Sequence, residues 1–199
     1  QRSFSMNATG TLRVLQAARY TSSLSCACVD RLLLASMSSL YGDDPSLPRV
    51  ESQLPRPLSP YAAGKLAAEH LMSVHARCFG MSTISLRLFN VFGPRQTADS
   101  PYSGVVASFA KRMLAGESPV IFGDGLQTRD FTFVADAVLA FLLAGFAKVP
   151  PRGEVVNVGT GRSVTLLELV RAMGQAVGAP HLHPTLQPER PAVVKHSLA

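Results

Sequence analysis

The sequence has too few cysteines, at unsuitable spacings, for a disulfide-stabilised or zinc-binding fold. Cys26, Cys28 and Cys78 are its three cysteines; they form no C-x-x-C pair and leave an odd count. This argues against a disulfide framework and a four-ligand zinc site. The five histidines, including His181 and His183, have no third ligand at a suitable spacing, so no metal site is predicted. Free thiols are typical of a reducing compartment, and we expect a cytoplasmic protein.

Long hydrophobic runs are also missing. The longest run, from Ala137 to Ala147, is bounded by charged residues and falls well short of the roughly 20 residues that a bilayer-spanning helix requires. The first residues carry a charge at Arg2 but no apolar segment behind it, so no secretory signal is visible. We therefore expect no association with a membrane.

Charged residues make up only 16% of the 199 residues, while 47% are hydrophobic. This composition excludes a disordered or fibrous chain and suffices for one compact domain with a further lobe. An excess of 19 Lys and Arg over 13 Asp and Glu gives a net charge of +6, which favours an anionic partner such as a phosphate group or a nucleic acid. Because the basic residues are dispersed rather than grouped in a stripe, we expect no nucleic-acid partner.

Strand and helix patterns alternate along the chain, which predicts an α/β protein. Apolar runs predict strands at 31–36, 83–89, 120–122, 131–134 and 154–158. Periodicity and capping signals predict helices at 7–20, 61–79, 104–116, 135–148 and 165–178. Residues 90–94 are expected to break the preceding strand, and the proline-rich tail from Ala179 is expected to be irregular.

Tyr61 and Lys65 are the strongest candidates for chemistry. They lie four residues apart on the predicted helix 61–79, so their side chains share one face. A nearby ammonium favours the phenolate and lowers the pKa of a phenol, which lets a tyrosine act as a general base toward a hydroxyl group. A lone Y-x-x-x-K spacing is common by chance, so the neighbouring sequence decides its meaning.

Four motifs occur in order along the chain. They are S-P-Y-A-A-G-K at 59–65, L-R-L-F-N-V-F-G-P-R-Q at 86–96, G-D-G-L-Q-T-R-D-F-T-F-V-A-D at 123–136 and N-V-G-T-G at 157–161. Together they resemble the extended short-chain dehydrogenase/reductase family, in its NAD-dependent epimerase/dehydratase branch. The chain is most similar to the 4-epimerases of UDP-glucose, UDP-N-acetylglucosamine or UDP-glucuronate. The likeness runs from N-x-x-G-T at Asn7 to R-P-x-x-V-x-H-S at Arg190.

This resemblance implies epimerisation at C4 of a UDP-sugar through a 4-keto intermediate, with NAD rather than NADP as cofactor. It makes Tyr61 the catalytic base, while Lys65 both tunes the phenol and holds the nicotinamide ribose. On the cofactor side, it implies that Asn7 supports the site and that Phe89 contacts the nicotinamide. It further implies a homodimer in the full-length form.

On the substrate side, the resemblance implies that Asn90 bonds the sugar diphosphate and that Arg129 and Arg190 bind the UDP ribose and phosphates. Arginine suits this role because its planar fork matches phosphate oxygens. Alternative interpretations remain for two features. Arg129 could form only a turn ion pair with Asp130, and the G-x-G at 159–161 is better explained by a turn than by phosphate contact.

Two departures from the family pattern bear on activity. Where the family has a Ser or Thr that shares the reacting hydroxyl with the tyrosine, this sequence has Met37, whose thioether cannot donate a hydrogen bond. Ser36 or Ser38 could substitute, and Ser38 is the preferred catalytic candidate. The Asp-Glu pair of the family's dehydratases is replaced by Ser38 and Ser39, which argues against dehydration.

The second departure is that no G-x-x-G-x-x-G turn precedes Asn7. We therefore expect an incomplete Rossmann-type parallel sheet, without its glycine-rich N-terminal half, and a smaller C-terminal α/β substrate-binding lobe. Residues 1–95 would form the C-terminal half of the NAD-binding domain and 96–199 mainly the nucleotide-sugar lobe, with strands near 131–134 and 154–158 as candidates for return to the main sheet. A truncated epimerase is the leading hypothesis; the alternatives are a UDP-sugar-binding protein without catalysis and another nucleotide-sugar-modifying enzyme, a dehydratase or reductase.

Overall fold

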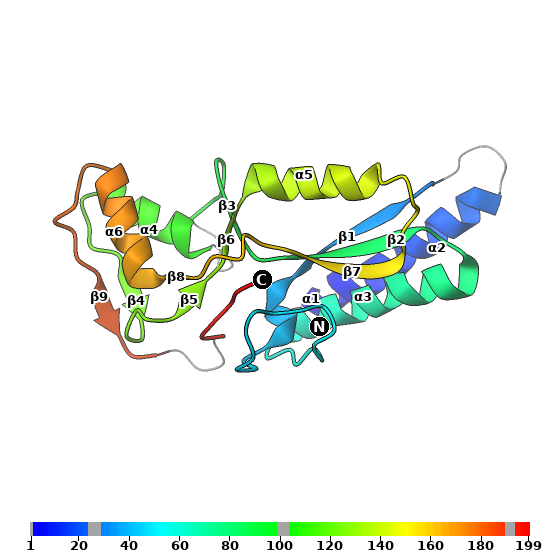
Figure 1. Cartoon of the computed structure of the whole chain (residues 1–199), viewed down its shortest axis with the longest axis horizontal. Coiled ribbons are helices and arrows are strands. Elements are labelled where there is room, and N and C mark those ends of the chain that lie inside the picture. The colour runs from blue at the N-terminus through cyan, green and yellow to red at the C-terminus, as the bar shows by residue number, and fades with distance from the viewer. Residues whose placement is uncertain (1, 24–28, 99–103, 190–193) are drawn as a thin grey trace.

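Three parallel strands form the central sheet of the computed structural model, which describes residues 2–23, 29–98, 104–189 and 194–199 (Figure 1). The strand order is β1 (Leu32–Met37), β2 (Thr83–Leu88) and β7 (Arg152–Val158). Met37 pairs with Leu88, which pairs with Val158, so the carboxyl ends of the three strands meet at one edge. The predicted α/β parallel sheet is confirmed. Open parallel sheets bind ligands at this edge.

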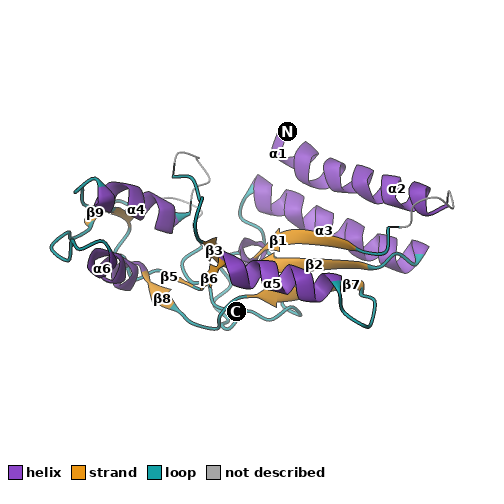
Figure 2. Cartoon of the chain, turned by 90° about the horizontal axis from the view of Figure 1, so that it is seen from above, coloured by secondary structure: helices purple, strands orange, loops and turns teal. Residues whose placement is uncertain are grey.

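Helices cover both faces of this sheet. α2 (Gly10–Ser23) and α3 (Pro60–Phe79) lie side by side on one face (Figure 2). α5 (Val134–Gly145) lies on the opposite face (Figure 1). No helix in the described part of the chain is long and apolar enough to cross a membrane.

The ends of α3 follow from three local signals. Ser59 Oγ accepts a hydrogen bond from the Ala62 amide at 3.1 Å, and Pro60 occupies the first helical position, where its missing N–H has no partner to lose. Gly80 takes the left-handed conformation, with φ +66°, directly after the helix. The predicted helix 61–79 is confirmed, and its start places Tyr61 in the first turn.

The chain before α2 is not a regular α-helix. α1 (Arg2–Phe4) and a π-helix, η1 (Ser5–Thr9), precede α2, so the predicted helix 7–20 becomes α-helical only at Gly10. At Gly64 of α3, an added Cβ would lie 3.5 Å from Asn7 Cβ and 3.6 Å from Phe4 Cα. The absence of a side chain at Gly64 therefore lets η1 pack closely onto α3.

A second group of elements lies beyond one end of the central sheet (Figure 1). Its core consists of buried side chains from two helices and one strand: Phe109, Met113, Ile121, Leu166 and Val170. Its elements are α4 (Val105–Leu114), α6 (Leu166–Ala176), the parallel pair β4 (Val120–Phe122) and β9 (Thr185–Gln187), and the antiparallel pair β5 (Thr128–Arg129) and β8 (Val164–Thr165). β9 corrects the expectation of an irregular tail, because the residues between two prolines pair with β4.

Residues 90–94 were expected to break the preceding strand, and β2 does end at Leu88. The sequence did not, however, predict that a further short strand follows. β3 (Asn90–Phe92) pairs in parallel with β6 (Phe131–Phe133), and the chain leaves this strand only at the Gly93-Pro94 pair. The partner strand is distant in sequence, so local patterns could not reveal the pairing. β3 and β6 form a sheet of their own, whereas β7 pairs with β2 in the central sheet.

Candidate functional site

Tyr61 and Lys65 share one face of α3 next to β1. Lys65 Nζ lies 6.0 Å from the centroid of the Tyr61 ring and donates a hydrogen bond to the carbonyl oxygen of Ala35, at 2.9 Å. Tyr61 is 37% exposed, whereas burial lowers the pKa of the Lys65 amine from its ordinary value. The structure thus brings an accessible phenol and a partly desolvated ammonium together beside the end of a parallel strand.

The three residues around the end of β1 have different surroundings. Ser36 is buried, and its hydroxyl donates to Glu69 Oε1 at 2.5 Å, so it cannot reach a ligand. Met37 is the last residue of β1. Ser38 begins the 3₁₀-helix η2 (Ser38–Tyr41) and is half-buried. Of the two serines that could replace the missing hydroxyl, only Ser38 is accessible.

The residues predicted on the cofactor side lie on two different elements. Asn7 is in the π-helix η1, where its side-chain amide donates to the carbonyl oxygen of Ser3 at 2.9 Å; such π segments are frequent at functional sites. Phe89 follows β2 and is only 2% exposed, and its amide donates to the carbonyl oxygen of Val158 at 3.0 Å. Asn7 packs on α3 beside Lys65, whereas the Phe89 side chain lies within the core.

Arg129 lines a cavity of about 380 Å³ in the second group of elements. Its Nη1 donates to the carbonyl oxygens of Thr128, at 2.7 Å, and Lys195, at 2.9 Å, and burial lowers the pKa of its guanidinium. Among the described residues, these are its hydrogen bonds, so Nη2 and Nε are available to a ligand. The apolar wall of the cavity includes Val105 and Val120.

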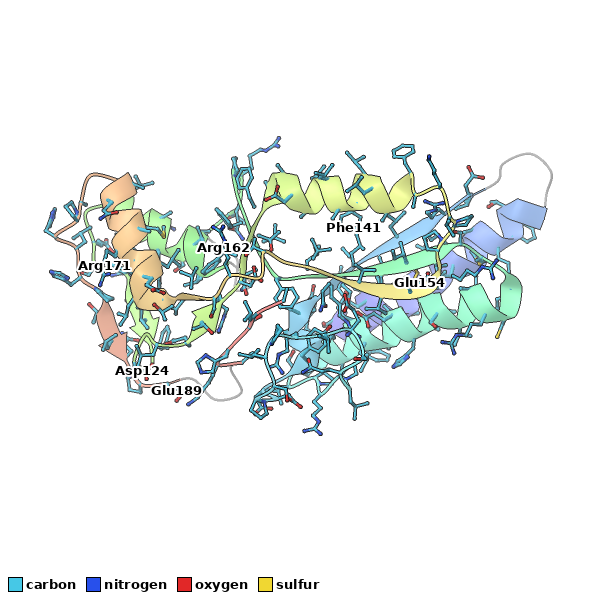
Figure 3. All side chains as sticks on the ribbon, in the orientation of Figure 1. Asp124, Phe141, Glu154, Arg162, Arg171 and Glu189 are labelled. Atoms are coloured by element: carbon cyan, nitrogen blue, oxygen red, sulfur yellow. The ribbon has the colours of Figure 1, made fainter. Side chains whose placement is uncertain are left out.

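The same cavity has polar residues that the sequence did not single out. Asp124 and Glu189, labelled in Figure 3, line it together with Lys195 and His196. The V-x-H-S end of the last motif was the available signal for His196. Arg190, predicted to bind the nucleotide, lies outside the described residues.

Asn90 and Asp130 connect the two groups of elements. The backbone amide of Asn90 donates to the carbonyl oxygen of Asp130 at 3.0 Å. The fully buried Asp130 carboxylate accepts hydrogen bonds from the amide and hydroxyl of Thr160, at 2.8 and 2.6 Å, and from the amides of Gly161, at 2.9 Å, and Ala199, at 3.2 Å. Asp130 therefore anchors the turn at 159–161 instead of pairing with Arg129, which favours the turn interpretation of the G-x-G.

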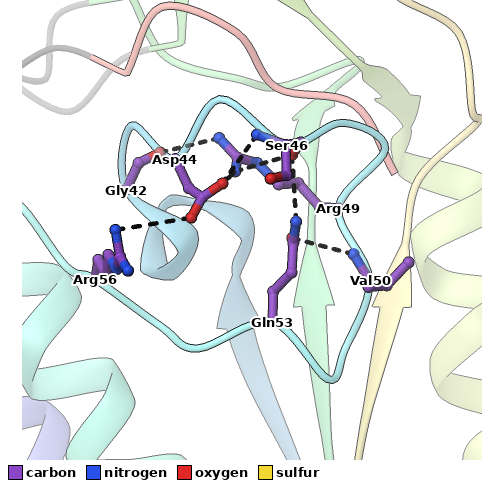
Figure 4. A network of polar contacts seen from close by, with 7 residues as sticks. All are labelled: Gly42, Asp44, Ser46, Arg49, Val50, Gln53 and Arg56. Atoms are coloured by element: carbon purple, nitrogen blue, oxygen red, sulfur yellow. Dashed lines mark hydrogen bonds and ion pairs between the residues drawn. The ribbon is translucent and has the colours of Figure 1, made fainter.

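The proline-rich loop after η2 is held by a buried arginine (Figure 4). Arg49, 3% exposed, donates through Nη2 to the carbonyl oxygen of Gly42, at 3.3 Å, and through Nη1 to that of Ser46, at 3.2 Å. Its Nη1 also lies 3.7 Å from a carboxylate oxygen of Asp44. These contacts order the loop beside the carboxyl edge of the sheet. No group of three His, Cys, Asp or Glu residues capable of holding a metal occurs in the described ranges.

A parallel sheet with helices on both faces and polar side chains at its carboxyl edge is the architecture of nucleotide-binding α/β proteins. The sequence profile described as "NAD dependent epimerase/dehydratase family" matches residues 1–159. The chain therefore belongs to the NAD-dependent epimerase/dehydratase family. This confirms the resemblance drawn from the motifs.

Named relatives and solved structures agree with this assignment. The UDP-glucose 4-epimerase of Mycolicibacterium smegmatis is 39% identical over 186 residues, which are 93% of this chain and 56% of that protein. The structure of UDP-glucose 4-epimerase from Thermotoga maritima with UDP-glucose matches with a TM-score of 0.90 at 34% identity, over 99% of this chain and 61% of that one. The Thermus thermophilus UDP-glucose 4-epimerase complex with NAD gives 0.84 at 37% identity, over 98% and 61%. The chain thus spans just over half the length of the curated relative.

Proposed function

We propose that these residues catalyse NAD-dependent epimerisation at C4 of a UDP-sugar, through a 4-keto intermediate, as part of a longer cytoplasmic polypeptide. The observation that carries the proposal is the meeting of Tyr61 and Lys65 at the end of β1, in a chain of the NAD-dependent epimerase/dehydratase family. The M. smegmatis relative supports both the reaction and the longer polypeptide, because the chain covers only 56% of it.

In this proposal, Tyr61 is the general base that removes the proton from the C4 hydroxyl. Tyr61 is 37% exposed, so a substrate can approach its side chain, and a cation on the same helix face favours the ionised phenol. Ser38 shares the reacting hydroxyl with Tyr61 and orients it. The carbonyl of Ala35 holds Lys65 in place through its hydrogen bond.

The residues present fit the nicotinamide end of NAD. A lysine ammonium has three donors, and among the described residues Lys65 makes one hydrogen bond, so two donors are left for ribose hydroxyls. Asn7 packs against α3 at Gly64, next to Lys65, and would support this side of the site. When bound, NAD supplies the acceptor and the donor of the C4 hydride.

The UDP part would occupy the cavity beside Arg129, whose volume of about 380 Å³ lies within the range of small-ligand sites. Within the described residues, Nη2 and Nε of Arg129 make no hydrogen bond, and they suit phosphate oxygens. Asn90 and Arg190 would complete the contacts to the diphosphate and ribose. Calorimetry with UDP tests this site: we expect binding by the chain, and a loss of binding in Arg129→Met at unchanged fold.

Turnover tests the larger claim. With UDP-glucose or UDP-N-acetylglucosamine and NAD, we expect negligible epimerisation by the 199 residues alone, because they contain no G-x-x-G-x-x-G turn to hold the cofactor. Robust turnover by these residues would contradict that part. We also propose a homodimer for the full-length form, since Val14, Val74 and Phe79 expose apolar side chains on α2 and α3; the mass of that form in solution tests it.

A second candidate is a UDP-sugar-binding protein without catalysis. Met37 favours it, because a thioether stands where the family has a hydroxyl. Binding of UDP without retention of NAD by the longer polypeptide would support this candidate. An increase in turnover on Met37→Ser would instead identify Met37 as a lesion in a working enzyme, and no change would favour Ser38 as the hydroxyl donor.

A further inference from the structure

A buried ion pair joins α3 to the sheet behind the candidate site. Glu69 of α3 and Arg87 of β2 are 3% and 4% exposed. Arg87 Nε donates to Glu69 Oε1 at 3.0 Å, and Nη2 donates to Oε2 at 2.8 Å. Such a pair adds little stability over apolar residues of the same volume, because desolvation offsets the attraction. Its presence here points to a role other than stability.

The pair also reaches the end of β1. The Ser36 hydroxyl donates to Glu69 Oε1 at 2.5 Å, and one helical turn earlier Lys65 Nζ donates to the carbonyl oxygen of Ala35 at 2.9 Å. Two consecutive residues of β1 are thus bonded by two side chains on one face of α3. These bonds fix the position of α3 along β1, and with it the distance from Lys65 to Ser38.

On its other side, Arg87 reaches η2. Its guanidinium carbon lies 4.8 Å from the centroid of the Tyr41 ring, and the Tyr41 hydroxyl donates to Asn157 Oδ1 of β7 at 2.6 Å. Asn157 Nδ2 donates in turn to the carbonyl oxygen of Arg49 at 2.9 Å. Tyr41 is the last residue of the 3₁₀-helix that Ser38 begins. A continuous polar chain therefore links α3, β2, η2 and β7.

We propose that Glu69 and Arg87 are positioning residues, which hold α3 in register with β1 and η2 so that Tyr61, Lys65 and Ser38 meet at one reacting hydroxyl. The roles of those three residues rest on the proposed function. The register of α3 against β1 is independent of the proposed function, and it can be measured without an activity assay. Neither Glu69 nor Arg87 touches the reacting atoms, so each acts only through the residues that it places.

Lys65 reports this register. The sequence contains four lysines, Lys65, Lys111, Lys148 and Lys195, so a ¹³Cε NMR titration of the whole chain resolves the Lys65 signal, which Lys65→Met assigns. Burial lowers the pKa of the Lys65 amine below 10.5; looser packing of α3 on β1 would hydrate the ammonium and raise it. The signals of the other three lysines serve as internal references between variants.

The main variant is Glu69→Leu with Arg87→Met, which removes both charges together and leaves no unpaired ion in the core. The local net charge is unchanged, and the Tyr61 ring beside Lys65 is left in place. We expect a folded protein in which the Lys65 midpoint moves up toward 10.5. A folded double variant with the wild-type midpoint would overturn the proposal.

Single changes at Ser36 keep the test decisive if the double variant does not fold. Ser36→Ala removes the bond to Glu69 and is expected to raise the Lys65 midpoint. Ser36→Thr keeps the hydroxyl and is expected to leave the midpoint at its wild-type value. The control is Glu117→Gln, which breaks the exposed pair with Arg112 and leaves the midpoint in place. An unmoved midpoint in Ser36→Ala would count against positioning.

Turnover separates this proposal from the proposed function. In a longer polypeptide that epimerises UDP-sugars, we expect the double variant to lose about 10–100-fold in kcat at nearly unchanged KM, because small misplacements of reacting groups are costly. If the longer polypeptide with the wild-type residues shows no turnover, but the Lys65 midpoint moves in the double variant, the proposed function is refuted and the positioning role stands. Turnover with an unmoved midpoint and an unchanged kcat would refute the positioning role alone.

Discussion

Replacement of Asp130 by alanine is expected to destabilise the fold. The carboxylate is fully buried and accepts the amides of Thr160 and Gly161. Thr160 and Gly161 are themselves exposed, so water can bond their amides once the carboxylate is removed. Each lost hydrogen bond is then expected to cost about 0.5–1.5 kcal/mol, and the free energy of unfolding should fall by about 1–3 kcal/mol for the two together. This is a substantial share of the roughly 5–15 kcal/mol that stabilises a typical domain.

Urea denaturation followed by circular dichroism measures this loss, and Asp130→Asn is the matched control. An asparagine keeps one carbonyl oxygen as acceptor but turns its NH₂ group toward donors on the other side. We expect it to lose about half as much stability as Asp130→Ala. A loss below about 1 kcal/mol in Asp130→Ala would refute the claim that this carboxylate anchors the turn at 159–161.

Three further changes test local features of the fold by the same denaturation assay. Ser59→Ala should cost about 1 kcal/mol because it removes the N-cap of α3, and Ser59→Asn should restore most of it; equal stabilities would contradict the capping role. Gly153→Ala should cost about 1–3 kcal/mol, because its φ is +92° and an added Cβ would lie 2.9 Å from Ser73 Cα. Gly178→Ala is the control and should cost less, because Gly178 also has a positive φ, +71°, but open space around it. The reverse order would contradict the packing argument. Hydrogen bonds from Thr165 hold the pKa of Glu168 below 4.5. The stability that Glu168 adds over Glu168→Gln should therefore be complete above pH 4.5 and lost as the pH falls through the lowered pKa. A stability difference that does not depend on pH would contradict this hydrogen bonding.

Helix ends could be predicted from the sequence because they are decided within a few residues. Ser59, Pro60 and Gly80 set the ends of α3 as expected. The T-x-x-E signal at the start of α6 is a complete capping box: the Thr165 hydroxyl oxygen accepts the Glu168 amide at 3.1 Å, and the Glu168 carboxylate accepts the Thr165 amide at 2.8 Å. The helical spacing of Tyr61 and Lys65 likewise followed from local structure alone.

Pairing over long sequence separations could not be predicted. The short strands β3 and β9 exist through their partners β6 and β4, and their own sequences contain Asn or lie between prolines, which signals a break. Glu69 has the pattern of a solvent-facing helix residue, and its buried partner Arg87 comes from a neighbouring strand. Nothing in the local pattern shows that these two charges face each other.

The choice between the two candidate serines also required the three-dimensional structure. The sequence left Ser36 and Ser38 as alternatives to the missing hydroxyl at Met37. Successive strand residues face opposite sides of a sheet, but the sequence does not show which side α3 covers. Ser36 faces Glu69 of α3, which leaves Ser38 at the start of η2 as the candidate.

The central claim is that Tyr61 is the base of a UDP-sugar epimerase. The most direct test joins these residues to the part of the M. smegmatis UDP-glucose 4-epimerase that they do not match, and follows the conversion of UDP-glucose in the presence of NAD. We predict turnover by this polypeptide and a decrease of about 10²–10⁴-fold in Tyr61→Phe at unchanged UDP binding, the usual contribution of a general base. Undiminished turnover in Tyr61→Phe would contradict the account.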